Sequence, residues 1–193
     1  MKKSWLGRTT KRRIDVTWQP EELGPVFLTQ EQIQQRVSQL GAEISRDYAD
    51  KDLIVIGVLK GILVFMADLL RAITIPVEVD FLAISRFEST EQTRGVVRVT
   101  KDLNEPLIGR HALLIEDIVD TGLTTHFILR TLQQQQPASL KTCTLLNRSR
   151  RRIIDVNLGY IGFDIPDYYL VGYGLDYKEK YRNLPYLVKF EPK

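Results

Sequence analysis

The order of hydrophobic and polar positions along the chain predicts helices that alternate with strands. Apolar residues recur at helical spacing over residues 30–48, after Thr29 and Gln32, which have the spacing of a capping box. Residues 53–59 form a short apolar run rich in β-branched side chains, as expected of a strand buried on both faces. The same patterns predict two more helices, at 62–72 and from Gly122 to before Pro137, and further strands at 77–84, 111–115 and 140–146.

The remaining segments are shorter and less regular. Residues 21–29 are predicted to be extended, 85–95 to be a polar loop and 96–99 to be a short return strand. Beyond Asp155 the pattern breaks into pieces punctuated by Tyr, Gly and Pro, at 159–166, 169–173 and 181–190. Alternating strands and helices predict an α/β fold with a mostly parallel sheet, and we expect a single domain over residues 1–193 whose irregular end forms a subdomain or cover.

Composition and charge narrow the class of protein. Cys143 is the single cysteine, which excludes an intrachain disulfide and a multi-cysteine zinc site and fits a reducing compartment. The net charge is +3, with 27 basic and 24 acidic residues. Six of the basic residues and no acidic residue lie in residues 1–14, so the rest of the chain carries 21 basic against 24 acidic residues. The basic character therefore belongs to an N-terminal arm, expected to be flexible, and not to the body.

Membrane and secretory assignments are disfavoured. The most apolar window, residues 53–70, contains Lys60 and Asp68, and charges near the middle of a membrane span are costly. No apolar stretch of seven or more residues follows the basic N-terminus, so we expect no secretory signal. The prediction is a soluble cytoplasmic protein.

The segment 113–125 carries the most informative chemistry. A buried strand leads into Glu116 and Asp117, and Asp120, Thr121 and Gly122 follow before a helix begins. In open α/β sheets, ligands bind beyond the carboxyl ends of strands, and a glycine turn at a helix N-terminus presents N–H groups to phosphate. The hydroxyls of Thr121, Thr124 and Thr125 can donate to phosphate oxygens. A helix cap would need one such residue, whereas three acids and three threonines lie within ten positions, which favours a site for a sugar phosphate.

This segment resembles the phosphoribosyl-diphosphate binding motif of the type I phosphoribosyltransferases. The resemblance extends to the hypoxanthine-guanine branch of that family, from about Thr29 to Phe190, with its motifs in order: 58–61, 162–167, 171–177 and 181–186. It implies the type I phosphoribosyltransferase fold, an open, mostly parallel sheet flanked by helices, with a small hood to which about residues 155–193 contribute. It also implies a Mg²⁺-dependent purine-salvage transferase that works as a homodimer or homotetramer.

The resemblance implies roles for individual residues on the side of the activated sugar. The diphosphate would be held by Leu59, Lys60, Gly61 and Arg182, and in the family the Leu59–Lys60 peptide bond can be cis. The 5′-phosphate would be held by the turn Asp120, Thr121, Gly122, Leu123 and Thr124. Glu116 and Asp117 would hold the ribose hydroxyls. The expected metal ligands are Glu116, Asp117 and Asp176.

On the purine side, the resemblance makes Asp120 the catalytic residue, a proton acceptor for the imidazole nitrogen. Tyr169 would stack on the purine and Leu170 would offer backbone groups to its edge. The implied substrates are phosphoribosyl diphosphate and a 6-oxopurine, hypoxanthine or guanine, and the products are a nucleoside monophosphate and diphosphate. The polar loop at 85–95 would be the lid that excludes water.

Two positions depart from the family pattern. The purine-side lysine, which meets the 6-oxo group, falls at Arg148, whose planar fork fills space differently. Arg148 either selects 6-oxopurines, shifts base preference or belongs to an exposed cluster over residues 148–152. In the lid, the Ser-Tyr pair of the family falls at Arg86–Phe87, which removes both hydroxyls.

Two alternatives to a purine transferase stay open at this point. The first is a nucleotide-sensing regulator that binds RNA through the basic arm and residues 148–152. Aromatic residues are absent from both clusters apart from Trp5, which disfavours a nucleic-acid partner. The second is a low-activity paralogue with altered base preference, suggested by Arg148 and Arg86–Phe87.

Overall fold

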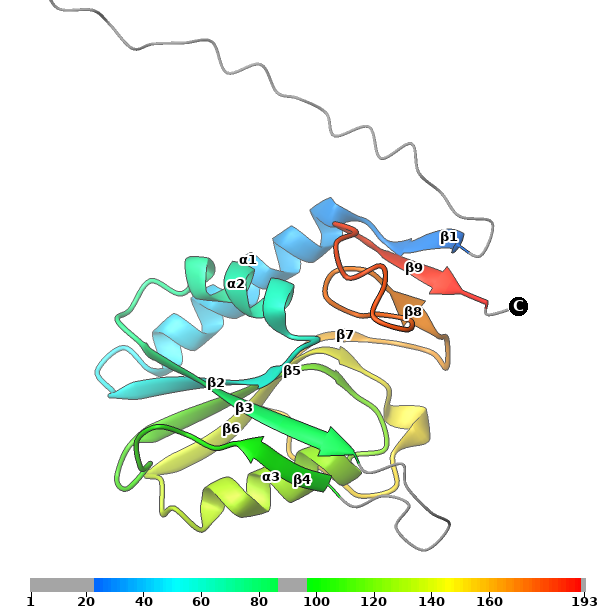
Figure 1. The fold of residues 1–193 in the computed structure, drawn as a ribbon. Coiled ribbons are helices and arrows are strands. Elements are labelled where there is room, and N and C mark those ends of the chain that lie inside the picture. Colours follow the sequence, from blue (N-terminus) through cyan, green and yellow to red (C-terminus); the bar gives the residue numbers. More distant parts are fainter. Residues whose placement is uncertain (1–22, 87–96, 192–193) are drawn as a thin grey trace, which may run out of the picture.

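The computed structural model describes residues 23–86 and 97–191 and shows a central sheet with helices on both faces (Figure 1). The six strands have the order β4-β3-β2-β5-β6-β7. All neighbouring pairs are parallel except β3 and β4. The strands are β2 (Leu53–Leu59), β3 (Glu78–Arg86), β4 (Val97–Lys101), β5 (His111–Val119), β6 (Ser139–Asn147) and β7 (Tyr160–Asp164). The expected open, mostly parallel α/β sheet is confirmed.

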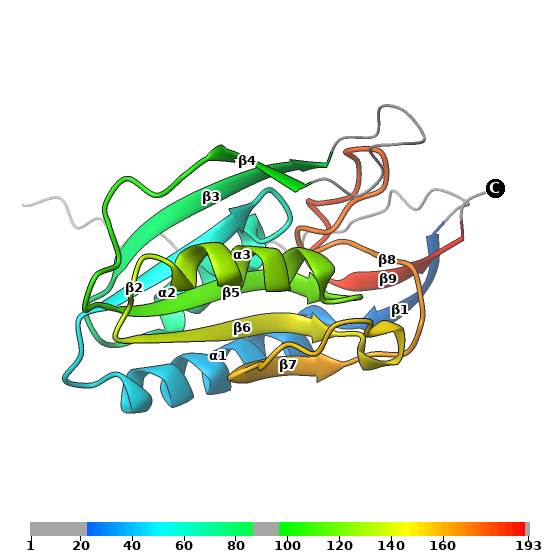
Figure 2. The ribbon, with the colours of Figure 1, turned by 90° about the horizontal axis from the view of Figure 1, so that it is seen from below.

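The period of two along the central strands separates two hydrophobic layers. On β2, Leu53 and Val55 pack with helices α1 (Gln30–Asp47) and α2 (Leu63–Ala72). Ile54 and Ile56 belong to the layer on the opposite face, under α3 (Leu123–Gln133). Figure 2 shows α3 in front of β5 and β6 when the sheet is seen from below, with α1 and α2 behind. Because both faces are covered, the strand β2 is apolar along its whole length, as the sequence predicted.

Helix α1 begins where its capping signal predicted. The backbone N–H of Gln32 donates to Thr29 Oγ1 and the N–H of Thr29 donates to Gln32 Oε1, so both halves of the capping box form. Helix α1 packs closely on α2 at Gly41. A Cβ at this position would lie 2.5 Å from the Cβ of Ala72, so the close contact requires glycine. Helix α2 begins one residue later than expected, at Leu63, with Ile62 as its N-cap.

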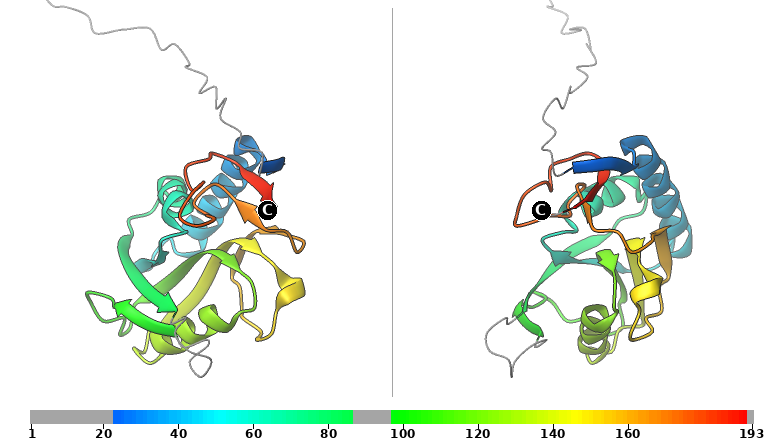
Figure 3. Two further views of the ribbon diagram at one scale, coloured as in Figure 1. Left: turned by 45° about the vertical axis from the view of Figure 1, so that its right-hand side comes forward. Right: turned by 90° about the vertical axis from the view of Figure 1, so that its right-hand side faces the viewer.

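A second, three-stranded sheet lies beside the first. Its order is β1-β9-β8, with β9 antiparallel to both neighbours. The strands are β1 (Leu23–Leu28), β8 (Leu170–Val171) and β9 (Leu187–Phe190). Both views in Figure 3 show β1 and β9 together, away from β3 and β4. The small hood therefore uses the segment that precedes α1, which the sequence predicted only as extended.

Two other details differ from the sequence predictions. The part of the chain beyond Asp155 was assigned to the hood, but β7 pairs with β6 in the central sheet, so this contribution begins after Asp164. The loop expected to be a lid, residues 85–95, lies mostly outside the described residues, and so does Phe87 of the departing pair. Among the described helices, none is long and apolar enough to cross a membrane.

Candidate functional site

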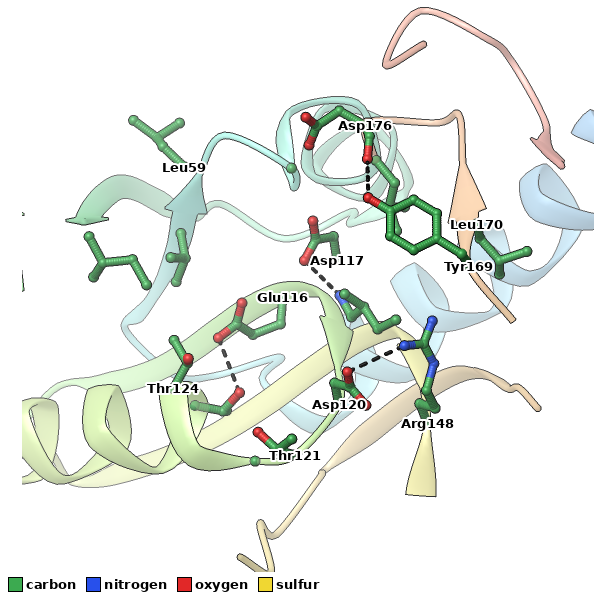
Figure 4. Close-up of a pocket in the computed structure, with 17 residues that line it drawn as sticks. Leu59, Glu116, Asp117, Asp120, Thr121, Thr124, Arg148, Tyr169, Leu170 and Asp176 are labelled. Atoms are coloured by element: carbon green, nitrogen blue, oxygen red, sulfur yellow. Dashed lines mark hydrogen bonds and ion pairs between the residues drawn. The ribbon is translucent and has the colours of Figure 1, made fainter. Parts of the chain in front are cut away.

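A cavity of about 440 Å³ lies at the carboxyl ends of β2, β5 and β6. Figure 4 shows side chains of β5, of the turn after it and of the hood facing one space. The predicted site residues that line the cavity are Leu59, Gly61, Glu116, Asp117, Asp120, Thr121, Gly122, Thr124, Arg148, Tyr169, Leu170 and Asp176. Lys60, Leu123 and Arg182 are the predicted residues outside this lining. The cavity also includes Thr125, whose hydroxyl we expected to donate to phosphate, and the apolar residues Val58, Ile84, Ile118 and Leu175, to which we assigned no individual role.

Strand β5 carries the two adjacent carboxylates differently from our prediction. We expected the strand to end at Glu116 and Asp117, but it continues to Val119 because its pairing with β6 continues to Asn147. On its other side, pairing with β2 stops at Ile115. Glu116 and Asp117 are therefore the first residues of β5 beyond its ladder with β2, which itself continues to Leu59 alongside β3, and both line the cavity.

Consecutive residues of a strand point to opposite faces, and the two carboxylates follow this rule. Glu116 lies on the α3 side, where Thr125 Oγ1 donates to Glu116 Oε1 at 3.3 Å. Both residues are buried. The hydroxyl of Thr125, which we expected to donate to phosphate, instead holds Glu116, because Thr125 lies on the face of α3 that packs on the sheet.

Asp117 lies on the opposite side, beneath the loop that follows β2. A Cβ on Gly61 would lie 1.7 Å from Asp117 Oδ2, so the loop can approach the carboxylate only because residue 61 is glycine. The N–H of Ile118 donates to Asp117 Oδ1 at 2.7 Å. Burial raises the pKa of Asp117 above its ordinary value, against the opposing effects of hydrogen bonds to Oδ1 and of the nearby Arg182 charge.

The turn after β5 forms the N-terminus of α3. Gly122 is the N-cap with φ +83°, a left-handed conformation that favours glycine. A Cβ there would lie 2.3 Å from the carbonyl oxygen of Ile154, so space as well as backbone conformation requires glycine. The first turn of a helix leaves N–H groups without intrahelical partners, and these groups and the helix dipole attract phosphate. The side chain of Leu123 is exposed and lies outside the cavity lining, so only its backbone N–H can serve this role.

On the other side of the cavity, Asp120 is held by arginines. Arg148 Nη1 lies 3.3 Å from Asp120 Oδ2 and Arg151 Nη1 lies 3.8 Å from the same oxygen. Asp120 Oδ1 and Arg148 Nε are buried and have no hydrogen-bond partner among the described residues. Arg148 Nη2 donates to the carbonyl of Tyr168, which ties β6 to the segment before β8. Asp167 Oδ1 lies 4.0 Å from Arg148 Nε, too far for a hydrogen bond, so one carboxylate oxygen and one guanidinium N–H of two cavity-lining residues keep their hydrogen-bonding capacity.

The basic turn over residues 148–152 is not a free cationic patch. Arg148 is buried, which overturns the interpretation of this residue as a member of an exposed cluster. Arg151 Nε pairs with Asp167 Oδ1 at 2.7 Å, and Arg152 donates to Asn147 and to the Val119 carbonyl. These contacts direct three of the arginines toward the protein rather than toward a nucleic acid.

Next to the cavity, the side chains of Lys60 and Arg182 form ion pairs with the carboxylates of Asp176 and Glu179. The Leu59–Lys60 peptide bond is cis, and Lys60 Nζ reaches Glu179 Oε2 at 3.1 Å. Arg182 Nη2 lies 2.8 Å from Asp176 Oδ1 and 3.3 Å from Glu179 Oε2. Arg182 Nη1 donates to the carbonyl of Gly174. Glu179 was not singled out from the sequence, because an exposed glutamate in a polar segment gives no signal of its own.

Comparison with known proteins identifies the family. A family model described as the phosphoribosyl transferase domain matches residues 27–178. The chain belongs to the phosphoribosyltransferase family. Similar proteins include the hypoxanthine-guanine phosphoribosyltransferase of Mycobacterium avium, which is 46% identical over 186 residues, 91% of this chain and 92% of that protein. The enzyme of the same name from Bacillus subtilis is 41% identical and covers 89% of this chain and 95% of its own length.

Solved structures agree with this phosphoribosyltransferase assignment. The crystal structure of a hypoxanthine phosphoribosyltransferase from Staphylococcus aureus matches with a TM-score of 0.84 at 41% identity, over 89% of this chain and 93% of that chain. A hypoxanthine-guanine phosphoribosyltransferase from Bacillus anthracis matches with a TM-score of 0.83 at 40% identity, over 88% and 100%. The resemblance drawn from the motifs, including the hypoxanthine-guanine branch, is confirmed.

The phosphoribosyltransferase cavity has its aromatic side in the hood. Tyr169 is half exposed and packs edge-on against Tyr177, with ring centroids 6.0 Å apart. Its hydroxyl donates to the carbonyl of Asp176 at 3.1 Å. Leu170 is buried in β8, opposite Lys189 of β9. Tyr177 and the carbonyl of Asp176 therefore hold the ring of Tyr169 in place, and Tyr169 also lines the cavity.

The acidic residues of the phosphoribosyltransferase site fit one mode of magnesium binding. No group of three or more His, Cys, Asp or Glu side chains among the described residues forms a metal site by itself. Mg²⁺ is usually held by one or two carboxylates together with waters and substrate phosphates. Asp117 and Asp176 line the same cavity. Burial raises the pKa of Asp117 because it disfavours the charged carboxylate, and a cation beside Asp117 would offset that cost. The donors fit an ion that arrives with a phosphorylated substrate.

Proposed function

We propose that the chain transfers the phosphoribosyl group of 5-phosphoribosyl 1-diphosphate to hypoxanthine or guanine, forming the nucleoside monophosphate and diphosphate. The observation that carries this proposal is the composition of one cavity. A glycine-capped helix N-terminus, two adjacent carboxylates of strand β5 and a fixed aromatic ring line the same 440 Å³. A sugar phosphate and a flat base need these three kinds of surface together.

On the sugar side, each group has a defined task. The N–H groups of the turn from Asp120 to Thr124 receive the 5′-phosphate at the start of α3. Glu116 and Asp117 accept hydrogen bonds from the ribose hydroxyls. When bound, Mg²⁺ would be held by Asp117 and Asp176 and would supply positive charge to the diphosphate.

On the purine side, the unpaired atoms of Asp120 and Arg148 set the orientation of the base. Asp120 Oδ1 accepts a hydrogen bond from the N–H of the purine imidazole ring. It takes up this proton as an imidazole nitrogen bonds to the anomeric carbon and diphosphate leaves. Arg148 Nε donates toward the 6-oxo group. Since Arg148 also holds Asp120 Oδ2, one side chain links recognition of the 6-oxo group to the position of the proton acceptor.

The leaving diphosphate gains negative charge as its bond to the anomeric carbon breaks. The N–H groups of the loop Leu59–Gly61 and the cations of Lys60 and Arg182 stabilise this charge. Such an activated sugar must be shielded from water, and we assign that task to the loop at 85–95.

Kinetics of Asp120→Asn test this assignment. Wild-type protein with Mg²⁺ and phosphoribosyl diphosphate should convert hypoxanthine to its monophosphate, and the variant should lose about a hundredfold in kcat with less than a threefold change in KM for the activated sugar. Asparagine keeps the shape and an oxygen for Arg148 but does not take up a proton at neutral pH. Asp50→Asn is the matched control, because Asp50 is exposed in the turn after α1 and lies outside the cavity lining, and its kcat should be unchanged. A variant at position 120 that is as active as wild type would contradict the role of Asp120.

One observation favours a second candidate function, a paralogue with altered base preference. Arg148 is buried at the place of the family's purine-side lysine and is committed to Asp120 and to the carbonyl of Tyr168. The larger fork reduces the space for the base, so preference among 6-oxopurines is set here. We also propose cytoplasmic localisation, supported by the buried free thiol of Cys143, and a homodimer or homotetramer, supported by family membership.

A further inference from the structure

A tight turn at the mouth of the cavity places Glu179 between the cations assigned to diphosphate. The N–H of Tyr177 donates to the carbonyl of Lys180 and the N–H of Lys180 donates back to the carbonyl of Tyr177, at 3.2 and 3.0 Å. The two central residues, Lys178 and Glu179, have φ of +50° and +63°. Positive φ at both central positions defines a type I′ turn, which normally contains Asn and Gly because left-handed backbone is unfavourable for other residues.

This unfavourable turn directs the carboxylate of Glu179 to a specific place. Glu179 Oε2 lies 3.1 Å from Lys60 Nζ and 3.3 Å from Arg182 Nη2, so a single oxygen contacts both cations. The N–H of Glu179 donates to Asp176 Oδ2 at 2.8 Å, while Arg182 contacts Asp176 Oδ1. One carboxylate oxygen between two cations, beside a carboxylate suited to magnesium, is the arrangement in which a diphosphate oxygen would bind.

The contacts of Glu179 are also of a kind that a stronger anion displaces. The side chains of Lys60 and Glu179 are 68% and 65% exposed, and exposed ion pairs contribute little because water screens them. A diphosphate carries several negative charges and offers several oxygens, so it competes well for the same two cations.

We propose that Glu179 is an internal counter-anion that occupies Lys60 and Arg182 in the empty site and competes with diphosphate for them. The proposal rests on the proposed function, because it takes these two cations as diphosphate ligands. Glu179 keeps Lys60 and Arg182 together before substrate binds, and its return after the reaction favours release of the diphosphate product. It is a positioning residue and does not touch the reacting atoms.

Calorimetric titration with inorganic diphosphate in excess MgCl₂ tests the proposal. Glu179→Gln keeps the size of the side chain and removes its charge, so diphosphate should bind with a dissociation constant roughly threefold to tenfold lower than in wild type. Diphosphate should also inhibit the variant more strongly as a product. Glu78→Gln is the matched control, because Glu78 is an exposed glutamate that pairs with Arg110 at 2.7 Å outside the cavity lining. Its affinity should equal that of wild type.

Two further variants keep the test independent of folding and of net charge. Glu179→Ala repeats the removal of the carboxylate if the glutamine variant does not fold. In a Lys60→Met background the gain from Glu179→Gln should shrink to less than twofold, because part of the competition has gone. Unchanged or weaker diphosphate binding by Glu179→Gln would overturn the proposal while leaving purine transfer by wild type untouched. Absence of diphosphate binding in wild type and variant alike would overturn the diphosphate site and this proposal with it.

Discussion

Gly61 and Gly174 together hold three parts of the cavity in contact. Gly61 lies above Asp117, with 1.7 Å between the position of an added Cβ and the carboxylate oxygen. On its other side, a Cβ at Gly174 would lie 2.1 Å from the carbonyl oxygen of Gly61. The loop after β2, strand β5 and the hood therefore meet through two residues that lack side chains. Any side chain at either position must move one part away from the others.

Gly61→Ala should separate the loop Leu59–Gly61, which we propose to hold diphosphate, from Asp117. Displacement of a substrate-positioning group by about 1 Å can lower activity about a hundredfold, so we expect a loss of that order in kcat/KM for phosphoribosyl diphosphate. Steady-state kinetics measure the effect, and circular dichroism checks that the variant folds. Gly109→Ala is the control for lost stability, because Gly109 has φ +71°, which disfavours alanine, while it lies before β5 at the far end of the strand and outside the cavity lining. Equal losses in both variants would show that loop contact with Asp117 is unimportant.

At the residue scale, the sequence predicted which residues line the cavity better than it predicted their partners. The motif placed Asp120 and Arg148 in the site, but 28 positions separate them and no local pattern pairs them. Thr125 was grouped with Thr121 and Thr124, whereas helical periodicity turns its hydroxyl to Glu116. No motif in the sequence includes Glu179, because its proposed role depends on its contacts with Lys60 and Arg182 in the folded chain.

At the scale of elements, hydrophobic periodicity predicted the strands and helices to within a few residues. Strand β5 shows why the ends were harder to predict. The apolar pattern stops at Ile115, because carboxylates follow, yet the strand continues to Val119 through its ladder with β6. Ladder partners come from distant parts of the chain, so the end of a strand depends on information that its own residues do not contain. The start of α1, by contrast, is marked by a local signal, the capping box of Thr29 and Gln32.

The capping box of α1 should therefore contribute to stability independently of the site. Thr29→Ala removes the acceptor for the N–H of Gln32, and we expect the free energy of unfolding to fall by about 1 kcal/mol. Urea denaturation measures this change. Gln35→Ala, at an exposed position in the interior of the same helix, should change stability by less than half as much. Turnover should stay at the wild-type level in both variants, and a loss of activity in Thr29→Ala would mean that α1 also positions the site.

At the scale of the whole molecule, the hood joins the two ends of the described chain. Strand β1 pairs with β9 through Leu23 opposite Phe190 and Leu28 opposite Leu187. The sequence could not predict this pairing, because neither segment contains a pattern that identifies the other. Its consequence for the site is direct, since β9 also pairs with β8, which carries Leu170 next to Tyr169.

The distribution of charge is consistent with a small anionic ligand rather than a polyanion. The net charge of +3 arises from the first 14 residues, which lie outside the described structure. Within the described chain, Lys60, Arg148 and Arg182 all have carboxylate partners beside the cavity. Because each of these cations already pairs with a carboxylate, a phosphorylated substrate would bind by replacing a carboxylate as the partner of the cation.

The most direct test of the central claim is transfer by the purified wild-type protein with Mg²⁺, phosphoribosyl diphosphate and each of four purines. We predict that hypoxanthine or guanine yields the corresponding monophosphate with one equivalent of diphosphate, and that adenine, which lacks the 6-oxo group, reacts at least about a hundredfold more slowly in kcat/KM. Xanthine, which also carries a 6-oxo group, reports how Arg148 sets preference. Failure to form a nucleotide from hypoxanthine or guanine, by a protein that still binds phosphoribosyl diphosphate, would contradict the account.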